Sequence, residues 1–74
     1  MQFNYKIIHK DGAFSYWWAR MLKNNKLKVE IRHYGSDGYY VAAKSNDYEL
    51  EPEDYQANID LIESLKGYEV IRLA

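Results

Sequence analysis

Two histidines, His9 and His33, are the residues of this chain whose chemistry could support catalysis or metal binding. Each stands at the end of an alternating segment, in phase with that segment's apolar side chains. As a pair they could hold a metal ion, and either could act as a general base with Ser36 or Asp37 nearby. No His-x-His or His-x-x-x-His spacing occurs, so we expect half-buried strand histidines bonded to carbonyl groups. We predict no catalytic residue, no metal site and no cofactor.

Carboxylates are the second group that could do chemistry, and they cluster in one segment. Residues 45–65 carry no basic side chain and seven acidic ones: Asp47, Glu49, Glu51, Glu53, Asp54, Asp60 and Glu63. A calcium loop of the EF-hand type needs a glycine at its sixth position and a glutamate at its twelfth, and this segment lacks both. The first five form what we call the acidic stretch, which could imitate a phosphate backbone toward a basic protein.

The composition limits the remaining classes of protein. The 74 residues are 47% hydrophobic and 28% charged, which is typical of one globular domain, and we expect residues 1–74 to form it. The longest apolar run, residues 39–43, is far shorter than the roughly 20 residues of a membrane span. The absence of cysteine fits a reducing compartment. We therefore expect a cytoplasmic protein that does not enter a membrane.

The first half of the chain has three segments with regular periodicity. Residues 2–9 alternate as a strand does, and residues 27–32 alternate without exception, with their apolar members on the inward side. Between them, residues 13–24 are predicted as an amphipathic helix, because apolar side chains recur at spacings of three and four. Trp18 would lie centrally on the buried side of this helix and Tyr16 on its far side. The recurring residues are Phe14, Trp17, Trp18, Met21 and Leu22.

The second half repeats this order of elements. Residues 39–44 are predicted as a strand, and residues 52–66 as a helix with Pro52 in its first turn and Gly67 beyond its end. Residues 68–74 are expected to form a last strand with Ile71 facing inward. The turn at residues 36–38 allows two hairpin registers. A two-residue Asp-Gly loop would pair Ile31 with Lys44 and place that lysine on the buried face. We prefer a three-residue loop with a left-handed glycine, which pairs Ile31 with Ala43, Glu30 with Lys44 and Tyr34 with Tyr40.

The order strand, helix, strand, strand, helix, strand predicts an α+β protein with the split βαβ arrangement (βαββαβ) of ferredoxin-like folds. Such a fold is a four-stranded antiparallel sheet with two helices on one face. This likeness concerns the order of elements alone. The other sheet face would be open, and in the preferred register it carries three tyrosines and three cations: Tyr34, Tyr40, Tyr68, Lys28, Arg32 and Lys44.

Two functions are compatible with these features. The first is a small protein-interaction module without catalysis, such as a phage-type or mobile-element inhibitor or adaptor. Its acidic stretch would meet a larger protein with a basic surface, and the tyrosine-bearing face could pair two copies as a homodimer. The alternative function is binding of single-stranded nucleic acid on the sheet face, as in RRM domains, with tyrosines stacking on bases. The sequence pI near 6.1 favours the first, because nucleic-acid-binding domains more often exceed about 9.

Overall fold

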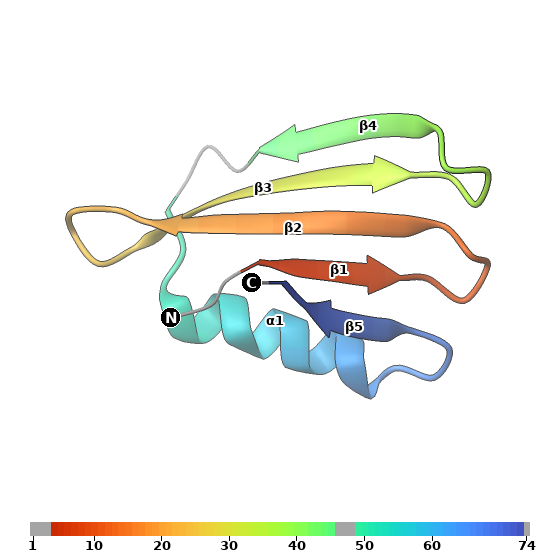
Figure 1. Ribbon diagram of the computed structural model, residues 1–74. Helices are drawn as coiled ribbons and strands as arrows, with labels where there is room; N and C mark the ends of the chain where they lie inside the picture. The colour runs from red at the N-terminus through yellow and green to blue at the C-terminus, as the bar shows by residue number, and fades with distance from the viewer. Residues whose placement is uncertain (1–3, 46–48, 74) are drawn as a thin grey trace.

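The protein is a five-stranded antiparallel sheet with one helix packed on one face (Figure 1). The computed structural model describes residues 4–45 and 49–73, with the backbone alone for Lys44 and Ser45. The strands lie in the order β4-β3-β2-β1-β5. The elements are β1 Tyr5–Ile8, β2 Phe14–Met21, β3 Leu27–Tyr34, β4 Tyr40–Ser45, α1 Pro52–Ser64 and β5 Glu69–Arg72.

The predicted ferredoxin-like fold is wrong, because the segment expected as the first helix is a strand. β2 lies centrally in the sheet, between β1 and β3. Half of its eight residues are aromatic, and such side chains lose rotamer freedom in a helix but pack well on a pleated surface. Ser15 and Trp17 face the helix, whereas Tyr16 and Trp18 face away from it, so Trp18 is not in the core. A central strand carries large side chains on both faces, and this imitated the spacing of a helix.

Three hairpins with the same loop connect β1 to β4. In each, three loop residues lie between two residues that are joined by a backbone hydrogen bond. The third loop residue has positive φ: Gly12 at 91°, Asn25 at 66° and Gly38 at 86°. The second loop residue is Asp11, Asn24 or Asp37, and its side-chain oxygen accepts a hydrogen bond from the backbone N–H two residues on. This is the three-residue hairpin with a left-handed last position. The prediction of that loop for residues 36–38 is confirmed.

The preferred β3–β4 register is correct beside the loop but wrong farther along the two strands. Tyr34 pairs with Tyr40 as predicted, but His33 then pairs with Ala42 and Ile31 with Lys44. The register shifts because Val41 is an extra residue on β4, a β-bulge. Both β4 and its bulge lie at the sheet edge, where bulges are common.

The core lies between α1 and the middle of the sheet. Its fully buried apolar side chains come from β1, β3 and α1: Tyr5, Ile7, Leu27, Val29, Tyr55 and Ile59. The expected inward side of β3 and the start of α1 at Pro52 are confirmed, and Gly67 has the positive φ, 89°, expected beyond the helix. The phase predicted for the last strand is wrong. Val70 packs on the core opposite Ile7, and Ile71 is 37% exposed.

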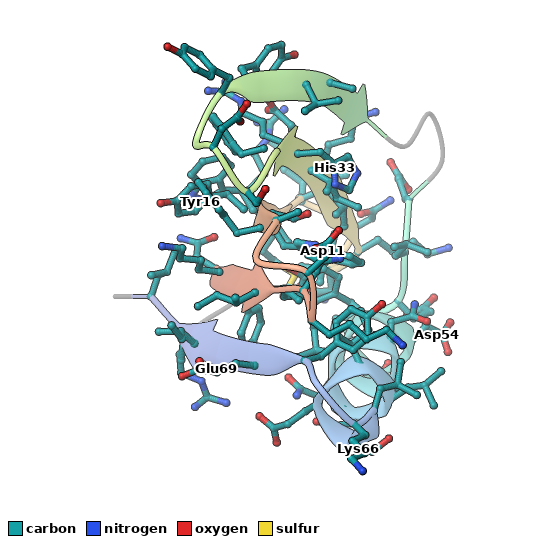
Figure 2. The ribbon with its side chains drawn as sticks, turned by 90° about the vertical axis from the view of Figure 1, so that its right-hand side faces the viewer. Asp11, Tyr16, His33, Asp54, Lys66 and Glu69 are labelled. Atoms are coloured by element: carbon teal, nitrogen blue, oxygen red, sulfur yellow. The ribbon has the colours of Figure 1, made fainter. Side chains whose placement is uncertain are left out.

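The helix covers only part of one face, so the rest of the sheet remains accessible. α1 lies along β1 and β5, away from β4, as Figure 1 shows. The two faces are seen edge-on in Figure 2, where Tyr16 projects to one side and His33 to the side of α1. Within residues 4–45 and 49–73, no helix is long and apolar enough to cross a lipid bilayer.

Candidate functional site

Aromatic rings cover the sheet face that α1 leaves open. Phe14 on β2 stacks on Tyr34 of β3 with ring centroids 5.1 Å apart, and Tyr16 stacks on Trp18 along β2 at 5.4 Å. Tyr40 meets Tyr34 edge-on at 5.8 Å. We call these five side chains the aromatic face. They come together because directly paired residues of neighbouring strands share a face, and aromatic pairs of this kind stabilise a sheet.

Cations lie over these rings. The Lys6 ammonium is 4.8 Å from the centroid of Phe14, and the Arg32 guanidinium is 5.4 Å from that of Trp18. Arg32 Nε also donates a hydrogen bond of 3.1 Å to Glu30, and this bond raises the pKa of the arginine above its ordinary value. The aromatic face is therefore bordered by positive charge, of which Arg32 is partly neutralised by its own neighbour.

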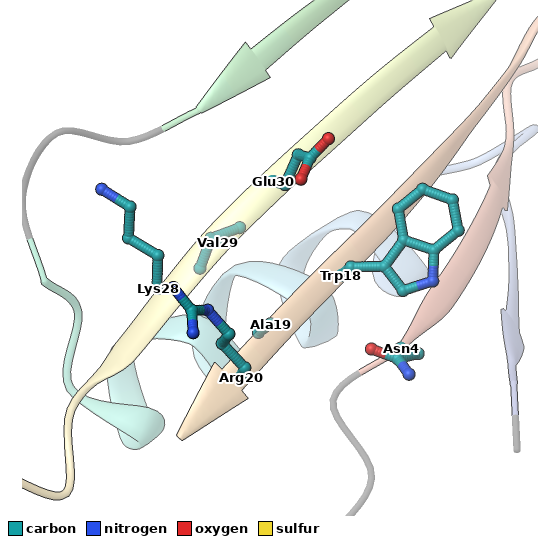
Figure 3. Close-up of a pocket in the computed structure, with 7 residues that line it drawn as sticks. All are labelled: Asn4, Trp18, Ala19, Arg20, Lys28, Val29 and Glu30. Atoms are coloured by element: carbon teal, nitrogen blue, oxygen red, sulfur yellow. The ribbon is translucent and has the colours of Figure 1, made fainter. Parts of the chain in front are cut away.

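A hollow of about 400 Å³ lies at one end of this face (Figure 3). Trp18 and Glu30, which pair across β2 and β3, line it together with Arg20 and Lys28. Arg20 and Lys28 are themselves direct cross-strand partners. Two cations side by side at this position give the hollow a local positive charge that suits an anionic ligand. Asn4 adds an amide to the same hollow.

The structure places the predicted sheet-face residues on two different faces of the sheet. Tyr34, Tyr40, Lys28 and Arg32 all lie on the open face, as their pairing with β2 and with each other shows. The side chain of Lys44 lies outside the described part of the chain. Tyr68 is on the opposite face, where its ring centroid is 5.3 Å from that of His9 and it packs against the core. Tyr68 was predicted on the open face because the predicted phase of the last strand is the reverse of the observed one.

Two members of the predicted acidic stretch, Glu49 and Glu51, have contacts within the chain. Asp47 lies outside the described residues. Glu49 accepts a hydrogen bond of 2.7 Å from Asn24, and Glu51 is 3.6 Å from the Lys26 ammonium. Glu53 and Asp54 are exposed in the first turn of α1, where the helix dipole favours acidic residues.

The central part of the open face was not predicted from the sequence. Phe14, Tyr16 and Trp18 were assigned to a helix, and Arg20 was placed on the far side of that helix. The available signal was the density of aromatic residues over residues 14–21, which favours a strand over a helix.

On the helix side, Ser15 connects the two histidines. Its side-chain oxygen lies 3.0 Å from His9 Nε2 and 2.7 Å from His33 Nδ1. Both histidines are half-buried as predicted, but their partner is this hydroxyl rather than a carbonyl group, and Ser15 is only 1% exposed. No group of three or more metal-ligating side chains occurs in the part of the chain that the structure describes.

Comparison with known proteins adds no relative: no protein-family model matches the chain, and neither the curated proteins nor the solved structures that were searched give a match.

Proposed function

We propose that the protein binds single-stranded nucleic acid on its open sheet face. The observation that carries the proposal is the like-charged pair Arg20 and Lys28 beside Trp18, in a hollow of about 400 Å³. A flat ring offers a stacking surface to any base, and paired cations suit a phosphate group. Single-stranded nucleic acid presents both groups in alternation along its backbone.

The distribution of charge supports this ligand despite the net charge of −1. Among the described strand residues, those on the open face include four cations, Lys6, Arg20, Lys28 and Arg32, and two acids, Glu30 and Glu69. The helix side carries exposed acids on and beside α1: Glu51, Glu53, Asp54, Asp60 and Glu63. A ligand that approaches the sheet therefore meets a locally positive surface, because charges more distant than about 10 Å are largely screened.

The contacts of the hollow suggest a mode of binding. A base would stack on Trp18, displacing the Arg32 guanidinium from the ring toward a backbone phosphate. Arg20 and Lys28 would hold the next phosphate. Glu30 and Asn4 could accept or donate hydrogen bonds at the edge of the base, as carboxylates and amides do in base recognition. Tyr34 and Tyr40 would extend the platform across β3 and β4.

Fluorescence anisotropy with a labelled single strand of about 10 nucleotides tests the proposal. We expect Trp18→Ala to weaken binding by about 1 to 3 kcal/mol, the range for loss of one stacked base. Lys28→Gln should reduce affinity and also flatten its decline between about 50 and 200 mM salt, because one fewer counterion is released.

Two controls separate the face from general effects of charge and apolar surface. Lys66→Gln removes the same charge beyond the end of α1, and Leu61→Ala removes an apolar side chain that is 61% exposed on the helix. Both should bind as the native protein does. Absence of binding at about 50 mM salt, or equal losses in Lys28→Gln and Lys66→Gln, would contradict the proposal.

A protein partner is the second candidate, and β4 is the observation that favours it. This strand forms a sheet edge, and Tyr40 and Val41 are 58% and 66% exposed. A segment of a larger protein, or a second copy of this chain, could pair with it. Capture of a protein that persists in Trp18→Ala but is lost on replacing Val41 with lysine would support this candidate. A cytoplasmic location, inferred from the lack of cysteine, belongs to both proposals.

A further inference from the structure

A cavity of about 230 Å³ lies on the helix side of the sheet, on the face opposite to the proposed nucleic-acid site. Its polar lining is the His9, Ser15 and His33 group. The remaining lining is apolar or aromatic and comes from β1, β2 and the region around the end of α1: Ile7, Trp17, Ile62, Leu65 and Tyr68. Leu65 is itself 46% exposed, so the cavity is reached from the surface.

The hydrogen bonds of this group leave binding capacity unused. Ser15 has one hydroxyl proton, so it donates to one histidine and accepts from the other. Each imidazole then keeps one further ring nitrogen, His9 Nδ1 and His33 Nε2, and no described residue bonds to either. A histidine that gains a proton becomes a donor at both nitrogens. The group can therefore donate to an acceptor that carries negative charge.

From this arrangement we infer that the cavity binds a small hydrophobic carboxylate. An apolar cavity of about 150 Å³ accommodates benzene, so 230 Å³ has room for a single ring with a carboxylate attached. The ring would lie among Ile7, Trp17 and Ile62. The carboxylate would accept hydrogen bonds from the ring nitrogens of the histidines that Ser15 leaves unbonded.

Two other uses of the group fit the structure less well. A metal ion would find only two imidazoles, because no third metal-ligating side chain joins them among the described residues. A nucleophilic role for Ser15 would need the hydroxyl to reach a substrate, but this side chain is 1% exposed and bonded on both sides. An apolar cavity with a few convergent polar groups is instead the usual form of a small-molecule site.

Benzoate and benzyl alcohol form a matched pair of probes, since they share the ring and differ in charge. Titrations followed by amide NMR shifts should place benzoate at the cavity, with a dissociation constant of about 1 mM or tighter. Benzyl alcohol should bind at least about 10-fold more weakly.

The ionisable groups around the cavity come from three segments: His9 on the β1 side, His33 on β3, and Tyr68 before β5 with the Lys10 ammonium 6.0 Å from its ring. The described lining residues from α1 and its end, Ile62 and Leu65, carry no charge. His33→Phe should abolish the preference for benzoate over benzyl alcohol. Arg32→Gln, the neighbouring change on the opposite face, should retain it.

Three results would overturn the inference. These are no shift of cavity residues at about 10 mM benzoate, equal binding of the two probes, or shifts confined to the aromatic face. All three are measured on the native chain, so they stand even if His33→Phe does not fold. Oligonucleotide binding is not part of the test, and either proposal can fail while the other holds.

Discussion

Alanine substitution of Trp17 and, separately, of Trp18 tests the phase of β2, on which both proposed sites depend. The two neighbours lie on opposite faces of the sheet. Trp17 packs against the core, with its ring centroid 6.4 Å from that of Tyr55. Trp18 lies on the open face against Tyr16 and Arg32. Because side chains alternate between the faces of a strand, the two chemically identical substitutions should reduce the stability of the fold by unequal amounts.

The expected magnitudes follow from these contacts. Truncating a buried aromatic side chain costs about 3 to 5 kcal/mol. Trp17→Ala should cost about 3 kcal/mol, because this half-buried ring packs against the core and Trp18 does not. Trp18→Ala removes one stacked pair and one cation–π contact, which together contribute about 1.5 kcal/mol. A 74-residue domain has a total stability of roughly 4 to 11 kcal/mol, so Trp17→Ala should leave the protein close to unfolding.

Urea denaturation followed by far-ultraviolet circular dichroism measures both variants without relying on tryptophan fluorescence. Trp17→Phe serves as a milder control that keeps an aromatic ring in the core. Trp18→Ala should stay folded and bind the oligonucleotide more weakly, whereas Trp17→Phe should bind it as the native protein does. A larger loss of stability in Trp18→Ala than in Trp17→Ala would refute the strand, since a helix over residues 13–24 would bury Trp18 instead.

Three further predictions concern the loops, the core and a surface ion pair. Gly38→Ala should cost about 1 kcal/mol in chemical denaturation, because φ is 86° and a Cβ there meets no atom within 4 Å. Gly67→Ala should cost more, since its Cβ would also lie 2.7 Å from Lys10 Cβ, and equal costs would contradict this. Burial, with a smaller effect of Tyr5, raises the pKa of Tyr55 above the ordinary 10.0. Above about pH 10 Tyr55 should ionise only in the unfolded chain, so stability should fall by up to about 1.4 kcal/mol per pH unit. Tyr55→Phe should remove this part of the decline in a pH series of denaturation curves. Glu51→Gln should change stability by less than about 0.5 kcal/mol, because its ion pair with Lys26 is exposed, and a loss above about 1 kcal/mol would show that we undervalue it.

The residues of the first two loops were sufficient to predict hairpins there. Gly12, Asn25 and Gly38 are each thirteen positions apart, and each follows Asp11, Asn24 or Asp37. Only the third was interpreted as a hairpin. The same chemistry at the first two loops predicts strands of about eight residues between them, which leaves no room for a helix over residues 13–24. Turn residues at a fixed spacing were thus a stronger signal than apolar spacing within one segment.

Other features depend on tertiary contacts that no local pattern reveals. The β3–β4 register changes at Val41, whose side chain is apolar but 66% exposed at the sheet edge. The phase of β5 is set by pairing with β1, where Val70 lies opposite Ile7. α1 was predictable because Pro52, the acids of its first turn, its buried residues Tyr55 and Ile59, and Gly67 all agree. The centre of the aromatic face was not predicted, because Phe14, Tyr16 and Trp18 reach it only through the pairing of β2 with its neighbouring strands.

β2 connects the two proposed sites. Ser15 joins the histidines on the helix side, and Trp18 with Arg20 lines the hollow on the other. Because side chains alternate, a strand displaced by one residue would exchange these sets and place Arg20 toward the core. The buried hydrogen bonds of Ser15 therefore stabilise the register that exposes Trp18. Ser15→Ala should weaken the preference of β2 for this register. A protein with benzoate bonded to its histidines should resist unfolding, with no change in its affinity for the oligonucleotide.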